Sequence, residues 1–377
     1  MVVRPATGGM KEHVLALSSG LRALGHEVDV AAPTDSDVFA AARAAQISTH
    51  AIPLVGPLNP LKDAAAVATV RRLVSAGGFD VVHAHGFKAG FVGRIATRLA
   101  GGAPFVVTAH NHVLERDETS GAAKTRYRTV ERALARYVTR YIAVSESIRR
   151  ELIEGYGLAD ARVVTIRNGI DAGPFLRPRD VTAARASLGL PLDARVIGLA
   201  ARFSSQKGLR HLIAALPELR LGEPRVLAAF GGSGPLESEL REQAAALEVG
   251  GAIRWLGYVS DVPGFLAALD VYVSPAETEA LGIGLIEASA AALPIVATDV
   301  GGAGEVVVDG VTGVLVPSRD SSSLAHATLA LLRDPERARS LGAAARERAV
   351  SDFGSERMVD QTARTYADAI AEGARTR

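Results

Sequence analysis

The 377-residue chain contains no cysteine, which excludes a disulfide framework, a thiol nucleophile and a thiolate metal site. No uninterrupted apolar run approaches the roughly 18 residues that a membrane-spanning helix needs. The first residues, MVVRPATGG, have too short an apolar stretch for a signal peptide. We therefore expect a cytoplasmic protein.

The chain also lacks a charge excess of either sign. A formal net charge of +1 argues against a dedicated nucleic-acid-binding protein. Lysine is scarce, with five lysines beside 37 arginines. A lysine that follows a predicted strand is therefore less readily explained as an ordinary surface charge. Hydrophobic residues make up 48% of a chain that is long for a single core, which predicts two globular domains.

Predicted strands alternate with predicted helices in two similar series, which is typical of an α/β fold with parallel sheets. We expect two doubly wound, Rossmann-like domains that face one another across a cleft. The first would cover residues 1–172 and the second 173–355. The last helix, 356–377, has no strand of its own to cover and is a candidate to pack across both domains.

Within residues 274–294, the carboxylates Glu279 and Glu287 lie on either side of a glycine-containing turn. The residues before the turn predict a buried strand, and those after it a helix that stops at Pro294. Open α/β sheets bind ligands at the carboxyl ends of strands, and a helix start preceded by glycines offers amides to phosphate. Carboxylates that bind hydroxyls beside a phosphate suggest a sugar nucleotide. An ordinary strand–helix junction with two solvated glutamates explains the spacing equally well.

Arg202 and Lys207 follow another predicted strand and would lie at the same sheet edge. Together they could neutralise a diphosphate, the arginine as a fork and the lysine as a point charge. The alternative is a surface turn with two charges. The turn GYVSD, with Val259 at its centre, could hold a base through its backbone, whereas the glycine cluster GGSGP is weak evidence for a phosphate loop.

In the first half, Gly8 and Gly9 begin a predicted helix and offer a second site of backbone donors. His85 ends the predicted strand VVHAH and is expected at the ligand-binding edge, with His83 on the other face of the strand. A single histidine is more often structural. The place of His85 at a strand end, before a glycine, nevertheless favours a role in the ligand-binding site. The acidic triplet 35–37 spells a DxD sequence in a polar loop, which we interpret as coincidence.

A basic stripe is predicted on a helix over residues 124–140. Its members recur at every fourth residue: Lys124, Arg128, Arg132, Arg136 and Arg140. Such a face could bind anionic lipid head groups. A solvated helix face is the preferred explanation, because the apolar side of the same helix suits ordinary core packing: Val130, Leu134, Tyr137 and Val138.

Together these segments resemble the retaining glycosyltransferases of family 4, which have the GT-B fold. The resemblance covers nearly the whole chain and rests on motifs in the family's order: GGMKEH, DVVHAHG, IAVSESIRREL, IRNGIDAGPF, AARFSSQKG, GGSGPLESEL, WLGYVSDV, ETEALGIGLIEASAAALP and TDVGGAGEVVVDGVTGVLV. No single motif is decisive, but the ordered set is specific. It implies a nucleoside-diphosphate-sugar donor, no cofactor, and a glycan, lipid-linked or small-molecule acceptor.

The resemblance also implies roles for the donor-side residues. Arg202 and Lys207 would bind the diphosphate, and Glu287 the ribose. The distal phosphate would be bound by the amides around the start of the predicted helix: Gly282, Ile283, Gly284 and Leu285. With these charges on the leaving group, no metal would be needed.

At the reacting carbon, the resemblance places Glu279 on the donor sugar and His85 over it, while the loop of Gly8 and Gly9 closes against donor and acceptor. It implies retention by attack on the face from which the diphosphate departs, with the leaving phosphate taking the acceptor's proton. Glu279 would then hold a hydroxyl and stabilise positive charge on the sugar ring, and would not be a nucleophile or base.

The chain departs from the family pattern at Ala280, Leu281 and Ala292, where glycine, phenylalanine and glycine are usual. An alanine that replaces a glycine of positive φ would be strained, and the donor-sugar pocket would change. The first strand is also short, which leaves open whether Met1 is the true start.

Other functions stay open: a sugar-nucleotide epimerase of GT-B type, a sugar-nucleotide-binding protein with weakened catalysis, or a peripheral scaffold at the inner face of the membrane through residues 124–140. The sequence does not identify the base, the sugar, the acceptor or the oligomeric state.

Overall fold

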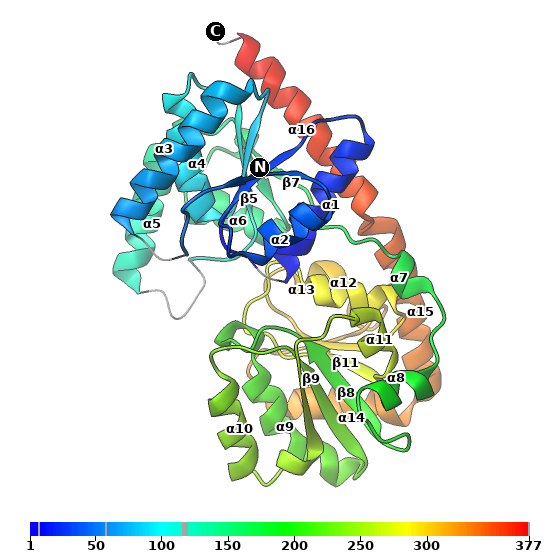
Figure 1. Cartoon of the computed structure of the whole chain (residues 1–377). Helices are drawn as coiled ribbons and strands as arrows, with labels where there is room; N and C mark the ends of the chain where they lie inside the picture. Colours follow the sequence, from blue (N-terminus) through cyan, green and yellow to red (C-terminus); the bar gives the residue numbers. More distant parts are fainter. Residues whose placement is uncertain (7, 57–58, 115–119, 376–377) are drawn as a thin grey trace. The chain divides into compact units, whose positions relative to one another are not determined.

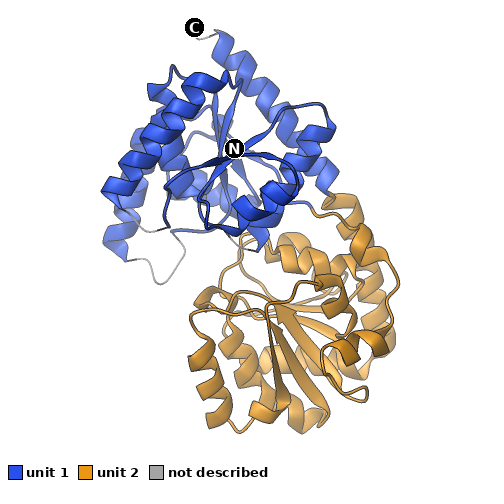
Figure 2. Ribbon diagram, in the orientation of Figure 1, with its two compact units in different colours: residues 1–169, 355–377 blue, residues 170–354 orange. Residues whose placement is uncertain are grey.

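The computed structural model describes residues 1–6, 8–56, 59–114 and 120–375, and it divides into two compact units (Figure 2). Unit 1 contains residues 1–169 and 355–377, and unit 2 contains residues 170–354. Each unit has a parallel sheet with helices packed on it, so the prediction of two Rossmann-like α/β domains is confirmed (Figure 1).

Unit 1 holds a seven-stranded sheet in the order β3-β2-β1-β4-β5-β6-β7. Its strands are β1 (Val2–Val3), β2 (Asp29–Ala32), β3 (Ser48–Ala51), β4 (Val82–His85), β5 (Phe105–Ala109), β6 (Arg140–Ala143) and β7 (Val163–Thr165). Its α-helices are α1 (Gly9–Ala23), α2 (Asp37–Ala44), α3 (Pro60–Gly77), α4 (Phe87–Leu99), α5 (Gly121–Leu134), α6 (Glu146–Arg150) and α16 (Ser355–Arg375). The strand order reverses between β1 and β4, which makes that pair the switch point where such sheets bind ligands.

Unit 2 holds a six-stranded parallel sheet in the order β10-β9-β8-β11-β12-β13, and its order reverses between β8 and β11. Its strands are β8 (Arg195–Ala200), β9 (Val226–Gly231), β10 (Ile253–Gly257), β11 (Val271–Ser274), β12 (Ile295–Thr298) and β13 (Val314–Val316). Its α-helices are α7 (Gly173–Leu176), α8 (Val181–Ser187), α9 (Leu209–Gly222), α10 (Glu237–Ala246), α11 (Val262–Ala267), α12 (Ile283–Ala290), α13 (Ala303–Val306), α14 (Ser321–Arg333) and α15 (Pro335–Asp352).

The last helix, α16, packs on α1 and β5 of unit 1 (Figure 1). Met358 and Val359 are buried there in an apolar cluster with Leu17 and Leu21 of α1. The contact is close, because a Cβ on Gly20 would lie 2.4 Å from a methyl group of Val359. That α16 packs across both domains stays a prediction.

The acidic triplet 35–37 has a local structural role. Ser36 is the N-cap of α2, and its hydroxyl accepts a hydrogen bond from the amide of Phe39. Asp37 lies in the first turn, where the helix dipole favours a carboxylate. A helix start therefore accounts for Ser36 and Asp37, and the interpretation of the DxD sequence as coincidence stays a prediction.

The predicted basic helix is shorter than expected, so this part of the prediction was wrong. Helix α5 ends at Leu134, a 3₁₀ turn covers Ala135–Tyr137, and Arg140 lies in β6. There its guanidinium pairs with Glu372 of α16 at 2.5 Å. The expected apolar face is also incomplete, since Val138 is buried but Val130 is 37% exposed. Membrane contact through residues 124–140 stays a prediction, and none of the described helices is long and apolar enough to cross a bilayer.

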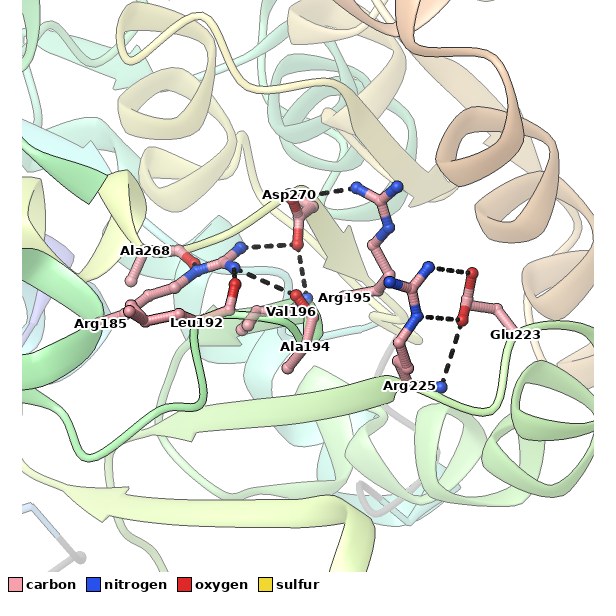
Figure 3. A network of polar contacts seen from close by, with 9 residues as sticks. All are labelled: Arg185, Leu192, Ala194, Arg195, Val196, Glu223, Arg225, Ala268 and Asp270. Atoms are coloured by element: carbon pink, nitrogen blue, oxygen red, sulfur yellow. Dashed lines mark hydrogen bonds and ion pairs between the residues drawn. The ribbon is translucent and has the colours of Figure 1, made fainter. Parts of the chain in front are cut away.

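A buried arginine ties α8 to the amino-terminal edge of the unit 2 sheet (Figure 3). The Arg185 guanidinium donates to three backbone carbonyl oxygens, those of Leu192, Ala194 and Ala268. It also donates to Asp270 at 2.7 Å, and Asp270 in turn accepts from the amide of Val196 at the start of β8. Because both charges are paired and hydrogen-bonded, their burial is tolerated.

The two departures near α12 have different consequences. Ala280 does not have positive φ, so the strain considered for it is absent. Ala292 has a φ of 57° directly after the helix, where glycine is preferred, so the strain considered there is present. Leu281 is fully buried in the core of unit 2.

Ala292→Gly is therefore expected to stabilise the protein by up to about 1 kcal/mol, because glycine adopts positive φ without a Cβ clash. Urea unfolding followed by circular dichroism would measure the change. Ala291→Gly is the matched control, since Ala291 has a φ of −74° at the C-cap. That control should lower stability, and a loss of stability in Ala292→Gly would contradict the strain argument.

Candidate functional site

The switch point of unit 2 brings the predicted donor-side residues together. Arg202 follows β8, and Lys207 lies in the 3₁₀ turn Ser205–Lys207 that leads into α9. Glu279 follows β11, the neighbour of β8, and Glu287 lies in α12. All four therefore belong to the segments after the two strands at which the sheet order reverses.

Lys207 and Glu279 form an ion pair in which the ammonium nitrogen lies 2.6 Å from a carboxylate oxygen. The lysine side chain is 31% exposed and the glutamate side chain 11%, so the pair is half-buried. A lysine and a carboxylate predicted to bind different parts of one donor are thus adjacent. Arg202 is exposed at the same edge, where it is accessible to a ligand.

Close backbone contacts hold the Lys207 turn against the segment after β11. The Gln206 carbonyl accepts hydrogen bonds from the amides of Glu277 and Thr278. Gly208 has a φ of 60°, and a Cβ there would lie 1.9 Å from the Pro275 carbonyl oxygen. Glycine is therefore required, and its presence in the sequence QKG fixes the lysine beside Glu279.

A second carboxylate, Glu277, anchors the same segment and was not predicted from the sequence. It accepts hydrogen bonds from His211 at 3.0 Å and from Arg319 at 3.0 Å, and it pairs with Arg210 at 2.6 Å. Burial alone would raise the pKa of Glu277, but these three partners hold it below its ordinary value. The signal that could have identified it is the alternation of Glu277 with Glu279 at a strand end.

Helix α12 begins at the switch point, where its backbone at Gly284 lies close to the Tyr272 side chain. Gly282 has a φ of 93° before the first turn, and a Cβ on Gly284 would lie 2.5 Å from the Tyr272 hydroxyl. Burial raises the pKa of Tyr272, and the negative charges of Glu287 and Glu279 raise it further, so the hydroxyl stays protonated near both carboxylates. The amide of Leu285 already donates to Gly282, which leaves those of Ile283 and Gly284 as the first-turn donors.

Two glycine-containing turns lie farther along the same edge. The turn that holds Val259 follows β10, and the Val259 side chain packs over Gly231 at the end of β9, where a Cβ would meet it at 2.8 Å. In GGSGP, a Cβ on Gly234 would lie 2.3 Å from the Phe203 carbonyl oxygen. Close packing accounts for this glycine, so the cluster gives no support for a phosphate loop.

In unit 1 the predicted residues also lie at the switch point. Gly8, with a φ of 58°, precedes α1 after β1, and Gly9 is the first residue of that helix. His85 ends β4, opposite Val3 of β1, and is fully buried. The structure thus places the predicted glycines and histidine after the two strands where the order reverses.

The expectation that His83 faces away from His85 was wrong. Residues two apart on a strand share one face, and the two ring centroids are 4.2 Å apart. His83 has both ring nitrogens engaged, with the Tyr366 hydroxyl at 2.6 Å and the Thr108 hydroxyl at 2.7 Å. It therefore links β4 to β5 and to α16.

Two further histidines, His13 of α1 and His110 after β5, complete a buried cluster that the sequence analysis did not identify. Nδ1 of His85 lies 3.0 Å from Nε2 of His110, and the ring centroids of His13 and His110 are 4.7 Å apart. His110 could have been found by the rule applied to His85, because it also follows a buried strand.

Burial keeps these imidazoles neutral. It lowers the pKa of His13 to about 4 and lowers the pKa values of His83, His85 and His110 well below the ordinary value. Each buried ring also disfavours a positive charge on its neighbours. The cluster is thus a set of neutral donors and acceptors at pH 7.

Acid is expected to destabilise unit 1 first. The pKa values of these histidines in the folded protein lie below the value near 6.5 in the unfolded chain. Their contribution to the free energy of unfolding is therefore fully present above pH 6.5 and is lost as the pH falls toward 4. For His13 alone the loss reaches about 3 kcal/mol at pH 4. Trp255, the single tryptophan, lies in unit 2, so its fluorescence would follow that unit while circular dichroism follows both.

The expected result is a circular dichroism transition that moves to lower urea between pH 7 and pH 5, ahead of the tryptophan transition. Equal shifts of both transitions, or no shift of either, would contradict a charge-sensitive histidine cluster in unit 1.

Family models match both halves of the chain. Residues 7–173 match the model described as Glycosyltransferase Family 4, and residues 180–348 match Glycosyl transferases group 1. Among curated proteins, the chain is 33% identical to a glycogen synthase of Mycobacterium tuberculosis, with 95% of this chain and 91% of that protein covered. It is also 33% identical to a phosphatidyl-myo-inositol mannosyltransferase of Mycolicibacterium smegmatis, with 87% and 82% covered.

Among solved structures, HepE of Anabaena in complex with UDP matches with a TM-score of 0.83 and 25% identity. The match covers 97% of this chain and 99% of HepE. The match therefore extends over both parallel-sheet units and is not confined to one of them.

Proposed function

The chain belongs to the family 4 glycosyltransferases of the GT-B fold, and on this premise we propose that it transfers a sugar from a nucleoside-diphosphate-sugar donor with retention of configuration and without a metal on the diphosphate. The observation that carries the proposal is the grouping of Arg202, Lys207, Glu279 and Glu287 after β8 and β11. These charges can bind a diphosphate and a hydroxylated sugar side by side.

In this proposal Arg202 and Lys207 stabilise the charge that develops on the departing diphosphate. The first-turn amides of α12 add partial positive charge at the same edge. Fixed donors aimed at a leaving group act without reorganisation during the reaction, which makes such electrostatic stabilisation large. The ion pair between Lys207 and Glu279 would break when Lys207 binds the diphosphate. Glu279 would then be available to accept hydrogen bonds from the sugar hydroxyls.

Glu287 would bind the ribose, and the turn around Val259 the base. Glu279 would hold a donor hydroxyl and stabilise positive charge on the sugar ring, so neither glutamate acts as a nucleophile. The leaving phosphate would take the acceptor's proton, so no separate base is needed. The catalytic role of His85, and the closure of the Gly8 and Gly9 loop, remain predictions for the acceptor side in unit 1.

Uridine diphosphate sugars are the first donors to test, because HepE was solved with UDP. For the acceptor, one relative is a glycogen synthase and another a phosphatidyl-myo-inositol mannosyltransferase, so we propose a carbohydrate or lipid-linked acceptor. A lipid-linked acceptor would agree with a weak peripheral membrane contact through residues 124–140 and a cytoplasmic location.

A thermal-shift screen of nucleoside diphosphate sugars would test the proposal. A donor at about 100 times its dissociation constant adds about 2.7 kcal/mol, which raises the melting temperature by roughly 5–10 °C for a unit of this size. The shift should be retained in Asp35→Ala, whose side chain is exposed at the helix α2 start, and lost in Glu287→Ala.

Release of nucleoside diphosphate then separates the alternatives. Acceptor-dependent release supports transfer. Binding without release would indicate a protein with weakened catalysis, and conversion of the donor sugar would indicate an epimerase. A shift that survives in Glu287→Ala would contradict the assignment of the site.

A further inference from the structure

Three histidine side chains from three different elements converge in unit 1. His13 comes from α1, His85 from the end of β4, and His110 from the residue after β5. They are 3%, 0% and 8% exposed. One ring nitrogen from each can be chosen so that all three lie within 4.8 Å of one another.

The rings of this cluster have unused hydrogen-bonding capacity. Neither nitrogen of His13 makes a hydrogen bond of good geometry, although the Asn168 side chain lies beside it, and Nε2 of His85 also has no partner. A buried polar atom without a partner costs about 1–3 kcal/mol. The neighbouring His83 differs, since both of its nitrogens are engaged. Buried imidazole nitrogens that lack partners, beside further imidazole nitrogens within 4.8 Å, are the arrangement expected of an empty ligand set.

We propose that His13, His85 and His110 form a binding site for a divalent transition-metal ion, with Zn²⁺ as the first choice. Imidazole is a preferred ligand of zinc, and three histidines with an open fourth position are a known zinc ligand set. All three ligands belong to unit 1, whereas the proposed diphosphate-binding residues, for which we expect no metal, belong to unit 2.

The geometry needs only a small adjustment. With Zn–N distances of 2.0–2.1 Å, ligand nitrogens of a tetrahedral site are about 3.4 Å apart. The pair His85 Nδ1 and His110 Nε2 is already at 3.0 Å. Because no two of the chosen nitrogens are more than 4.8 Å apart, each separation must shorten by at most about 1.4 Å, within reach of a side-chain rotation.

The surrounding charges limit the affinity. All three ligands are neutral, so they do not neutralise the charge of the bound ion. The positive charge of the Arg4 guanidinium also disfavours a cation at His110. The amino group of Met1 contributes little at pH 7, because burial lowers its pKa to about 6. The site is therefore expected to be reversible, and removal of the Arg4 charge should strengthen it.

An ion at this site would change what His85 can do. Coordination would turn one ring nitrogen of His85 toward the metal and away from any substrate. If His85 acts on the donor sugar, as the proposed function assumes, Zn²⁺ would inhibit transfer. The binding itself does not depend on that function.

Cobalt titration of the full-length protein would test the site. After chelator treatment and removal of the chelator, Co²⁺ should bind at one equivalent and give the intense visible spectrum of a four-coordinate ion, and Zn²⁺ should displace it. His13→Gln and His110→Gln should each abolish the spectrum. His326→Gln should not change it, because that side chain is 72% exposed and pairs with Glu218.

Arg4→Met supplies a readout in the opposite direction. Loss of the positive charge that disfavours a cation at His110 should tighten Co²⁺ binding by roughly three- to tenfold, a gain that misfolding cannot produce. The proposal is overturned if the folded wild type gives no four-coordinate spectrum, if the spectrum persists in His13→Gln, or if Arg4→Met binds no more tightly. Failure of donor binding in the thermal-shift screen would leave these results unaffected, so the two proposals fail separately.

Discussion

Lys207→Ala is expected to lower kcat/KM for sugar transfer by about 10²–10³-fold, the effect of removing one donor that stabilises developing negative charge. The structure gives a second reason for a large effect. Glu279 has a side chain only 11% exposed and loses its ionic partner at 2.6 Å. The variant therefore both weakens the hold on the diphosphate and disturbs the carboxylate expected at the donor sugar.

Steady-state kinetics and donor titration would measure this loss. Lys62→Ala is the matched control, because Lys62 is an exposed lysine of α3 in unit 1, and it should leave kcat/KM unchanged. Lys207→Arg should recover only part of the activity, since a planar guanidinium does not replace a point charge on a phosphate. Full activity in Lys207→Ala would remove the basis of the donor-site assignment.

The largest expected effect on stability is that of Arg185→Leu. This side chain donates to three backbone carbonyls and to Asp270, and the residue is 6% exposed. Its removal leaves a partly buried carboxylate and three carbonyl oxygens without their donor. Breaking a buried pair in this way typically costs about 3–5 kcal/mol.

Urea unfolding monitored by Trp255 fluorescence would report this loss, since tryptophan and network lie in the same unit. Arg225→Leu provides the control in the same region (Figure 3). Arg225 is paired with Glu223 through two hydrogen bonds, but it is exposed, so its loss should be close to undetectable. Equal effects of the two variants would show that Arg185 is not a structural anchor.

Much of the fold could be predicted because short apolar segments that end at glycine, proline or histidine mark parallel strands whatever their order in the sheet. Glu279, Lys207 and His85 were identified by the same rule, as polar residues at the end of such a segment or in the turn after it, and Glu287 from the helix that follows that turn. The rule needs no knowledge of which strands are neighbours. It therefore found candidates in both units before any topology was available.

What the sequence could not provide is which strand ends meet. His13, His85 and His110 are distant in sequence, and only the order β1-β4-β5 brings them together. The ionic partners of Glu277 likewise come from α9 and from Arg319, far along the chain. The end of α5 was misplaced for a different reason: the four-residue spacing of basic residues persists by chance into β6, where Arg140 begins a strand with buried Tyr141 and Ile142.

Because α16 follows the whole of unit 2 in the sequence yet packs on β5 and α1 of unit 1, unit 1 cannot be completed before unit 2 has been synthesised. Until then the apolar surface that Met358 and Val359 cover is exposed. His83 also lacks its hydrogen-bond partner, the Tyr366 hydroxyl. A truncation before Ser355 is thus expected to harm unit 1, although most of that unit lies far from the lesion in sequence.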